Sequence, residues 1–179
     1  MVIYTDAATS TSIIAAVVID VENFSKFPAF EAVLSEQADT SWADSFSETN
    51  LIYGLEMLAV IATMFVLRDF LAGRNVVFYV DNLNTKDALV KGHSDSPAID
   101  KLIKIFWAFA QSSGAWVWIE HVPGTRNIAD LHTRNVVLPP PRKFSSSFGI
   151  LSILSKWVTK DSLATEYFQF YGTPNTGRK

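Results

Sequence analysis

Four carboxylates lie at positions where an acid could take part in chemistry. Asp6 and Asp81 each end an apolar run typical of a strand, and Asp130 follows a Pro-Gly loop at the start of an expected helix. Glu56 lies within an apolar stretch, where the charged form of a carboxylate is disfavoured unless a cation or a donor compensates it. Taken singly, Asp6 and Asp81 could be turn residues, and Asp130 could be an acid favoured by the helix dipole.

Taken together, the four acids indicate a site for divalent cations. If the strands before Asp6 and Asp81 are adjacent and parallel, both acids lie at the carboxyl ends of strands, where open α/β sheets place their sites. Clustered carboxylates repel one another, and Mg²⁺ is the usual ion for carboxylate and water ligands. Two such ions about 4 Å apart stabilise both the attacking and the leaving oxygen in phosphodiester cleavage.

The elements that must position these acids follow from the hydrophobic pattern. The pattern predicts strands over 2–6, 13–20, 30–34, 75–80 and 115–121, and helices over 51–71, 85–90, 98–111, 127–134 and 148–158. Residues 35–50 are polar and acidic and are expected to form a loop. This order predicts an α/β fold with a mixed five-stranded sheet, in which three antiparallel strands are followed by parallel ones, with helices on both faces.

Length and composition limit the possible classes of protein. The chain has 179 residues, enough for one domain or one domain with a tail. It has no cysteine, which excludes a disulfide scaffold, a Cys-based zinc site and a thiol nucleophile. Residues 1–136 hold 9 Lys and Arg against 16 Asp and Glu, whereas residues 137–179 hold 6 against 2. We therefore expect one domain over 1–136, which holds the four acids, and a basic, aromatic extension over 137–179, partly helical.

One stretch has the composition of a membrane span. Residues 51–67 carry a single charge, that of Glu56. A span needs roughly 20 apolar residues, and a central acid costs on the order of 3 kcal/mol. We therefore expect a buried helix and no membrane partner. The N-terminus also lacks the basic and apolar regions of a signal peptide.

The sequence around the four acids resembles the ribonuclease H family over roughly residues 2–135. The matching stretches are IYTDAATS, ETNLIYGLEMLAVIATMFVL, VVFYVDNLNTKDAL and IEHVPGTRNIADLHTR. They are most similar to the RNase H domains that follow the reverse transcriptase in retrotransposons of the tyrosine-recombinase type, where "LE-LAV", "DN" and "H-PG–N–AD-L–R" recur in this order.

This resemblance implies hydrolysis of the RNA strand of an RNA/DNA hybrid. It makes Asp6, Glu56, Asp81 and Asp130 the catalytic carboxylates that bind two Mg²⁺ ions, which Mn²⁺ could replace. One ion would activate water and the other would stabilise the 3′-oxyanion leaving group. His121, expected in the loop before the last acid, corresponds to a histidine that aids product release in many members; an exposed loop histidine is the alternative.

Four further residues are candidates for binding the substrate. Asn82 and Asn84 could contact its backbone or its 2′-hydroxyls, or could form turns. Arg126 and Arg134 could contact phosphates, or could lie on the solvated surface. Asn127 is expected to cap the last helix instead of touching the substrate.

The chain also departs from the cellular pattern of the family. Ala7 follows Asp6 where cellular members favour glycine, and no helix rich in Lys and Arg is expected between 84–91 and 98–111. Phosphate neutralisation supplies much of non-specific nucleic-acid affinity, so the isolated domain should bind weakly. We expect a fused or partner reverse transcriptase domain to supply affinity, and an intracellular location, cytoplasmic or nuclear. The alternative is a catalytically silent RNase H-like scaffold module in a larger nucleic-acid-processing assembly.

Overall fold

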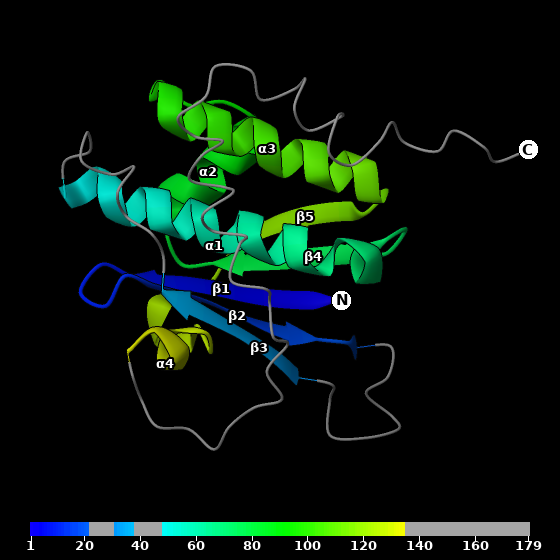
Figure 1. The fold of residues 1–179 in the computed structure, drawn as a ribbon, viewed down its shortest axis with the longest axis horizontal. Helices are drawn as coiled ribbons and strands as arrows, with labels where there is room; N and C mark the ends of the chain where they lie inside the picture. The colour runs from blue at the N-terminus through cyan, green and yellow to red at the C-terminus, as the bar shows by residue number, and fades with distance from the viewer. Residues whose placement is uncertain (22–30, 38–47, 135–179) are drawn as a thin grey trace, which may run out of the picture.

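The computed structural model describes residues 1–21, 31–37 and 48–134, with only the backbone described over 31–37 and 48–50 (Figure 1). The helix predicted over 148–158 and the extension predicted over 137–179 lie outside these residues. The described part forms a twisted sheet with helices on both of its faces.

The sheet is mixed and has the strand order β3-β2-β1-β4-β5. Its strands are β1 (Val2–Ala8), β2 (Ile13–Ile19), β3 (Glu31–Gln37), β4 (Asn75–Val80) and β5 (Trp116–His121). β2 pairs antiparallel with β1 and with β3, whereas β4 pairs parallel with β1 and with β5. The predicted mixed α/β architecture is therefore confirmed.

The parallel pairing of β1 with β4 positions the candidate site. The register sets Tyr4 against Tyr79, and the two rings stack with centroids 4.9 Å apart. Asp6 follows Tyr4 by two residues, and Asp81 follows Tyr79 by two residues. The two acids therefore reach the same end of the sheet, as the sequence predicts.

Three helices cover one face of the sheet, and a short helix lies on the other (Figure 1). The first face carries α1 (Glu48–Leu71), α2 (Leu83–Lys91) and α3 (Pro97–Ser113). α4 (Asp130–Thr133) packs on the opposite face over β1 and β2, where Ala129 and Val17 are fully buried. The main core lies between the sheet and the three helices, with Phe78 and Phe106 in edge-to-face contact at its centre.

α1 is the described helix whose length and apolar composition would allow a membrane crossing, over Leu51–Leu71. Of its most apolar 18-residue window, 67% is buried inside the molecule. It packs against α3 and against β1 and β2. The core helix of a soluble protein can have the same length and apolar composition. The burial and packing of α1 are those of a core helix.

The sequence predicted several boundaries incorrectly. β3 runs to Gln37, inside the predicted loop, and α1 begins at Glu48 instead of 51. The helix predicted over 127–134 is shortened to α4, and a 3-10 turn, η3 (Gly124–Arg126), precedes the predicted range. The helix starts late because the Oδ1 atom of Asn127 accepts a hydrogen bond from the backbone N–H of Ala129 at 3.2 Å, which turns the chain before α4 begins.

Candidate metal centre

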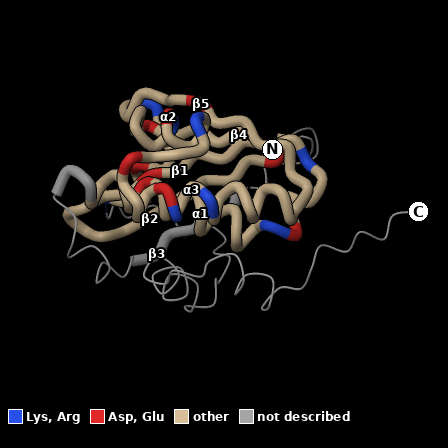
Figure 2. The backbone as a smooth tube through the Cα atoms, turned by 90° about the horizontal axis from the view of Figure 1, so that it is seen from above, with Lys and Arg blue, Asp and Glu red and all other residues tan. Residues whose placement is uncertain are grey.

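Three elements bring three acids together at one end of the sheet. Asp6 comes from β1, Glu56 from α1, and Asp81 directly follows β4. One carboxylate oxygen from each lies within 4.8 Å of the other two. Figure 2 shows acidic segments of the chain gathered beside β1. We call Asp6, Glu56 and Asp81 the acidic cluster.

Glu56 is the most deeply enclosed acid of the cluster. Its side chain is 2% exposed, and its Oε1 atom accepts a hydrogen bond from the backbone N–H of Ala7 at 3.3 Å. Its Oε2 atom is buried and has no hydrogen-bond partner within the described part of the chain. Burial, and then the nearby charges of Asp81 and Asp6, raise the pKa of Glu56 well above its usual value. A divalent cation would satisfy this oxygen and offset the repulsion, so the residues fit a hard metal ion.

Asp6 is held by hydrogen bonds from residues far along the chain. Its Oδ2 atom accepts from the Thr133 hydroxyl, and its Oδ1 atom accepts from Asn127 Nδ2 at 3.4 Å. Burial raises the pKa of Asp6 to about 6, and the charges of Asp81 and Asp130 add to this, while the hydrogen bond from Thr133 opposes it. Asp6 therefore loses its proton closer to neutral pH than a free aspartate does, because its pKa is raised.

Asp81 is half-buried and lies against the Pro-Gly turn. A Cβ atom built on Gly124 would meet its Oδ2 atom at 3.2 Å, so the absence of a side chain there leaves space for the carboxylate. His121 Nε2 lies 3.2 Å from the backbone oxygen of Asp81. Because a carbonyl oxygen only accepts, this nitrogen must carry the hydrogen.

His121 is the last residue of β5 and pairs with Val80, as the strand predicted over 115–121 implies, so the loop that was expected to hold it begins one residue later. β5 reaches His121 because its parallel pairing with β4 continues to the end of β4. The contact of His121 with the Asp81 main chain is a positioning contact. Its predicted part in product release stays a prediction.

Asp130 is separate from the acidic cluster. It begins α4, and its Oδ1 atom accepts a hydrogen bond from Arg134 Nε at 2.7 Å, which forms an ion pair across one helical turn. It is close enough for its charge to raise the pKa of Asp6. Three of the four predicted acids thus meet within 4.8 Å, and a ligand role for Asp130 stays a prediction.

The predicted substrate-binding residues surround this end of the sheet. Asn82 caps α2, its Oδ1 atom accepting from the backbone N–H groups of Asn84 at 3.0 Å and Thr85 at 3.2 Å. The side chain of Asn84 is exposed, as is that of Arg126 in η3. Arg134 is exposed and paired with Asp130. Their contacts with a substrate stay predictions.

The sequence reasoning missed two contacts to Asp6. The sequence predicts only a capping role for Asn127, yet its Nδ2 atom also donates to the Thr5 carbonyl at 2.9 Å and reaches Asp6. The sequence predicts no role for Thr133. The signal for Asn127 was its place in the PGTRN stretch, whereas nothing local marks Thr133, because its partner lies 127 residues away.

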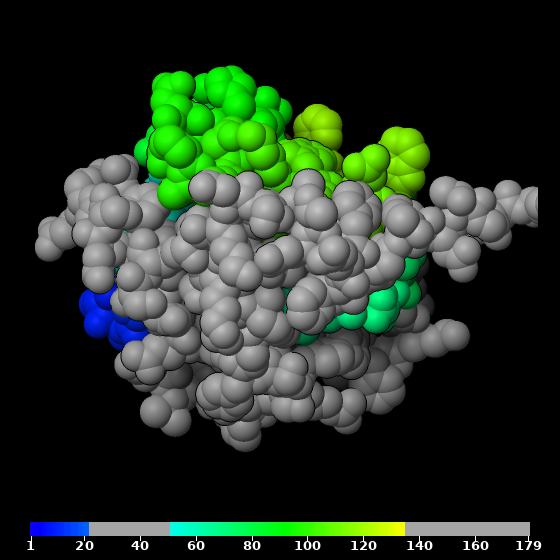
Figure 3. All heavy atoms as spheres, turned by 45° about the horizontal axis from the view of Figure 1, so that its top comes forward, coloured from blue at the N-terminus to red at the C-terminus, as the bar shows by residue number. Residues whose placement is uncertain are grey.

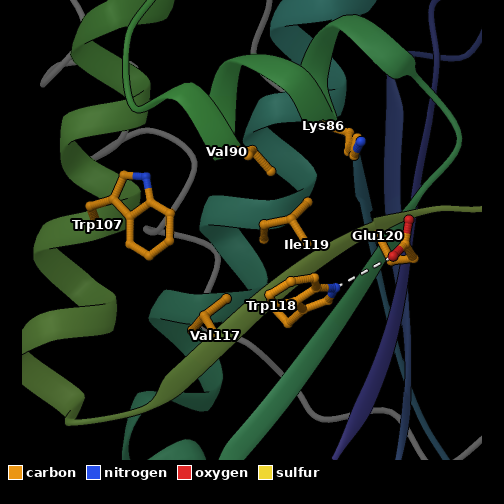
Figure 4. A pocket seen from close by; sticks show the side chains of 7 residues that line it. All are labelled: Lys86, Val90, Trp107, Val117, Trp118, Ile119 and Glu120. Atoms are coloured by element: carbon orange, nitrogen blue, oxygen red, sulfur yellow. Dashed lines mark hydrogen bonds between the residues drawn. The ribbon is translucent and has the colours of Figure 1, made fainter.

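A second feature lies on the flank of β5. It is a hollow of about 300 Å³ between β5, α2 and α3 (Figure 4), lined by Lys86, Val90, Trp107, Val117, Trp118, Ile119 and Glu120. Trp118 and Trp116 are 65% and 76% exposed, and aromatic rings in the colour of β5 project from the surface beside α3 (Figure 3). None of the lining residues belongs to the acidic cluster.

Comparison with solved structures identifies the type of fold. RNase H1 from the halophilic archaeon Halobacterium salinarum NRC-1 aligns with a TM-score of 0.56 and 17% identity, covering 75% of this chain and 95% of that one. The N-terminal RNase H domain of Rv2228c from Mycobacterium tuberculosis, a fusion with maltose-binding protein, aligns with a TM-score of 0.51 and 17% identity, covering 75% and 91%. No protein-family model and no curated protein sequence matches the chain. The fold is RNase H-like.

Proposed function

We propose that this chain is a metal-dependent endonuclease that hydrolyses the RNA strand of RNA/DNA hybrids. The observation that carries the proposal is the acidic cluster, whose ligand atoms lie within 4.8 Å of one another on an RNase H-like fold. Glu56 strengthens it, because one of its buried oxygens has no hydrogen-bond partner among the described residues, and such an oxygen is costly in an apolar core unless a cation is to be bound there.

The acidic cluster would hold two Mg²⁺ ions, with Mn²⁺ as a substitute, and Asp130 would complete the ligand set from α4. When bound, the ions supply an activated water and charge stabilisation of the 3′-oxyanion leaving group. Asp6, Glu56 and Asp81 fix the position of that charge. The Pro-Gly turn leaves room for the Asp81 carboxylate, and His121 holds the Asp81 main chain.

The exposed polar residues around the cluster are proposed to bind the hybrid. Arg126 and Arg134 would contact phosphates, and Asn82 and Asn84 would contact the backbone or the 2′-hydroxyls of the RNA strand. Asn84 and Arg126 support this, because both side chains are exposed and follow the two strands, β4 and β5, that end at the cluster. His121 is proposed to aid product release.

We further propose that the chain is the RNase H part of a retroelement reverse transcriptase. It would act inside the cell, in the cytoplasm or the nucleus. Its sheet would have five strands, with β3 at the edge. The support is the order of the sequence motifs and the short connection between α2 and α3. Only residues 92–96 join these helices, and no helix lies between them. A basic helix that could grip the hybrid is therefore missing at that point, which is consistent with a polymerase domain supplying affinity.

A substrate panel tests the proposal. The full chain is incubated in Mg²⁺ or Mn²⁺ with an RNA/DNA hybrid, single-stranded RNA, duplex RNA and duplex DNA, each end-labelled. We expect internal cuts in the RNA strand of the hybrid alone, abolished by EDTA. A hybrid that is bound and left intact in both metals would favour the silent scaffold module, and cuts in duplex DNA would indicate a different nuclease.

A further inference from the structure

The Asp6 carboxylate accepts hydrogen bonds from two residues that lie 127 and 121 positions further along the chain. The Thr133 hydroxyl donates to Oδ2, and Asn127 Nδ2 lies 3.4 Å from Oδ1. Both side chains are buried, as is Asp6 itself at 3% exposure. The same Asn127 nitrogen also donates to the Thr5 carbonyl at 2.9 Å, so the turn before α4 is tied to the β1 backbone as well.

These contacts are compatible with metal binding. A carboxylate offers roughly four lone-pair positions, and two donors leave about two of them for a cation. Charge-assisted hydrogen bonds are stronger and more directional than neutral ones, so they fix the rotation of the carboxylate. Residues that orient metal ligands in this way typically change affinity when they are removed.

We propose that Thr133, supported by Asn127, is a positioning residue that orients Asp6 for metal binding. The inference rests on the proposed function, because it requires that the acidic cluster bind a divalent cation. Thr133 lies on α4, whereas the cluster comes from β1, α1 and β4. The position of α4 on the sheet would thereby determine how well the cluster holds metal.

The alternative is that Thr133 has a purely structural role. Its hydroxyl also lies 3.0 Å from the backbone oxygen of Asp130, a common contact within a helix. Thr63 provides a matched control, because it is also a buried threonine, and its hydroxyl donates to the Ala59 carbonyl at 2.7 Å. The Thr63 hydroxyl thus donates to a carbonyl oxygen, whereas that of Thr133 donates to a carboxylate.

The experiment is a Mn²⁺ titration of the full chain, in which the sharp signal of free Mn²⁺ is followed by electron paramagnetic resonance without substrate. We expect Thr133→Val to weaken binding about 10–100-fold, the usual cost of losing an outer-sphere partner. Thr133→Ser keeps the hydroxyl and should bind within about threefold of the native chain. Thr63→Val should leave the affinity unchanged.

The outcomes separate this inference from the proposed function. If the native chain binds Mn²⁺, Asp6→Asn does not, and Thr133→Val binds like the native chain, the positioning role is overturned. If the native chain binds no Mn²⁺, the proposed function fails and the inference fails with it. If Thr133→Val does not fold, Thr133→Ala takes its place, because it lacks the hydroxyl and adds no bulk.

A second readout needs no metal. In EDTA, the changes in melting temperature caused by Thr133→Val and by Asp6→Ala should be non-additive, because each removes one side of the same contact. Thr63→Val and Asp6→Ala should be additive. Additive effects for Thr133 would show that its hydroxyl acts independently of Asp6 and would contradict the proposal.

Discussion

Asp81 is the least buried acid of the cluster and the one whose charge raises the pKa of both of its neighbours. Replacing it by asparagine removes charge while keeping volume. In EDTA this should relieve the repulsion on Asp6 and Glu56 and raise the melting temperature by about 2–4 °C, the effect of about 1 kcal/mol in a domain of this size. Differential scanning calorimetry measures it, and an unchanged or lower melting point would contradict a clustered site.

The raised pKa of Asp6 makes stability without metal depend on pH. In the unfolded chain this acid loses its proton near 3.8, whereas in the folded chain it does so near 6. Between these values the folded state binds more protons, so the free energy of unfolding falls as pH rises through about 4 to 6. The raised pKa of Glu56 adds a fall of the same sign. Melting temperatures in EDTA from pH 4 to pH 8 should show this decline.

Metal should weaken that dependence of stability on pH, because cation binding favours the deprotonated carboxylates. In millimolar Mg²⁺ the decline towards pH 8 should become shallower, and Asp6→Asn should flatten the curve recorded in EDTA. A curve in EDTA that rises between pH 4 and pH 6 and does not respond to Asp6→Asn would show that the acids of the cluster do not control stability in this range.

At the scale of elements, the turn between β5 and α4 closes the acidic cluster on one side. A Cβ atom on Gly124 would lie 3.2 Å from Asp81 Oδ2, tighter than most contacts of this kind. We expect Gly124→Ala to displace the carboxylate by a few tenths of an ångström and to lower kcat several-fold, with little change in melting temperature because the position is exposed. Thr125→Ala, at the exposed neighbouring position, is the control and should be neutral.

The pairing of β4 with β5 places His121 beside Val80, next to Asp81, and this leads to a prediction for His121. Its Nε2 atom lies 3.2 Å from the backbone oxygen of Asp81, which is its hydrogen-bond partner in the described part of the chain. His121→Ala should therefore slow turnover far less than Asp81→Asn does, in steady-state assays of hybrid cleavage. A loss as large as that of Asp81→Asn would mean that His121 does more than position a strand end or aid product release.

Local sequence signals were enough to predict whether a segment forms a helix or a strand, but they did not give the residues at which each element begins and ends. The β-branched run of β2 and the apolar run of β4 allowed their strands to be predicted. β3 extends to Gln37 because pairing with β2 continues into residues that look like a loop. The late start of the helix predicted over 127–134 depends on the Asn127 side chain, whose hydrogen bond from Ala129 competes with a helical start.

The site could be predicted in part for the same reason. Asp6, Glu56 and Asp81 were recognisable because each stands at a strand end or within an apolar helix. Their meeting required the parallel pairing of β1 with β4, which α/β topology favours. Thr133 could not be predicted, because its contact with Asp6 depends on how α4 packs across β1.

At the scale of the whole molecule, charge is unevenly divided along the chain. Residues 1–136 hold 9 Lys and Arg against 16 Asp and Glu, and the connection between α2 and α3 contains no basic helix. Phosphate contacts supply most non-specific affinity, so the chain alone should bind a hybrid more weakly than low-nanomolar at physiological salt. Fluorescence anisotropy with the Asp81→Asn variant measures this, and low-nanomolar affinity would remove the need for a partner domain.

The most direct test of the central claim is cleavage of a hybrid labelled on both strands, in Mg²⁺, by the native chain and by two aspartate-to-asparagine variants. Asp81→Asn should reduce the rate more than about 100-fold, exceeding the usual loss for an outer-sphere residue. Asp87→Asn, at an exposed position on α2, should cleave normally. Cuts confined to the RNA strand and lost only in Asp81→Asn are the predicted result. Cleavage that survives in Asp81→Asn would contradict the assignment of the acidic cluster as the active site.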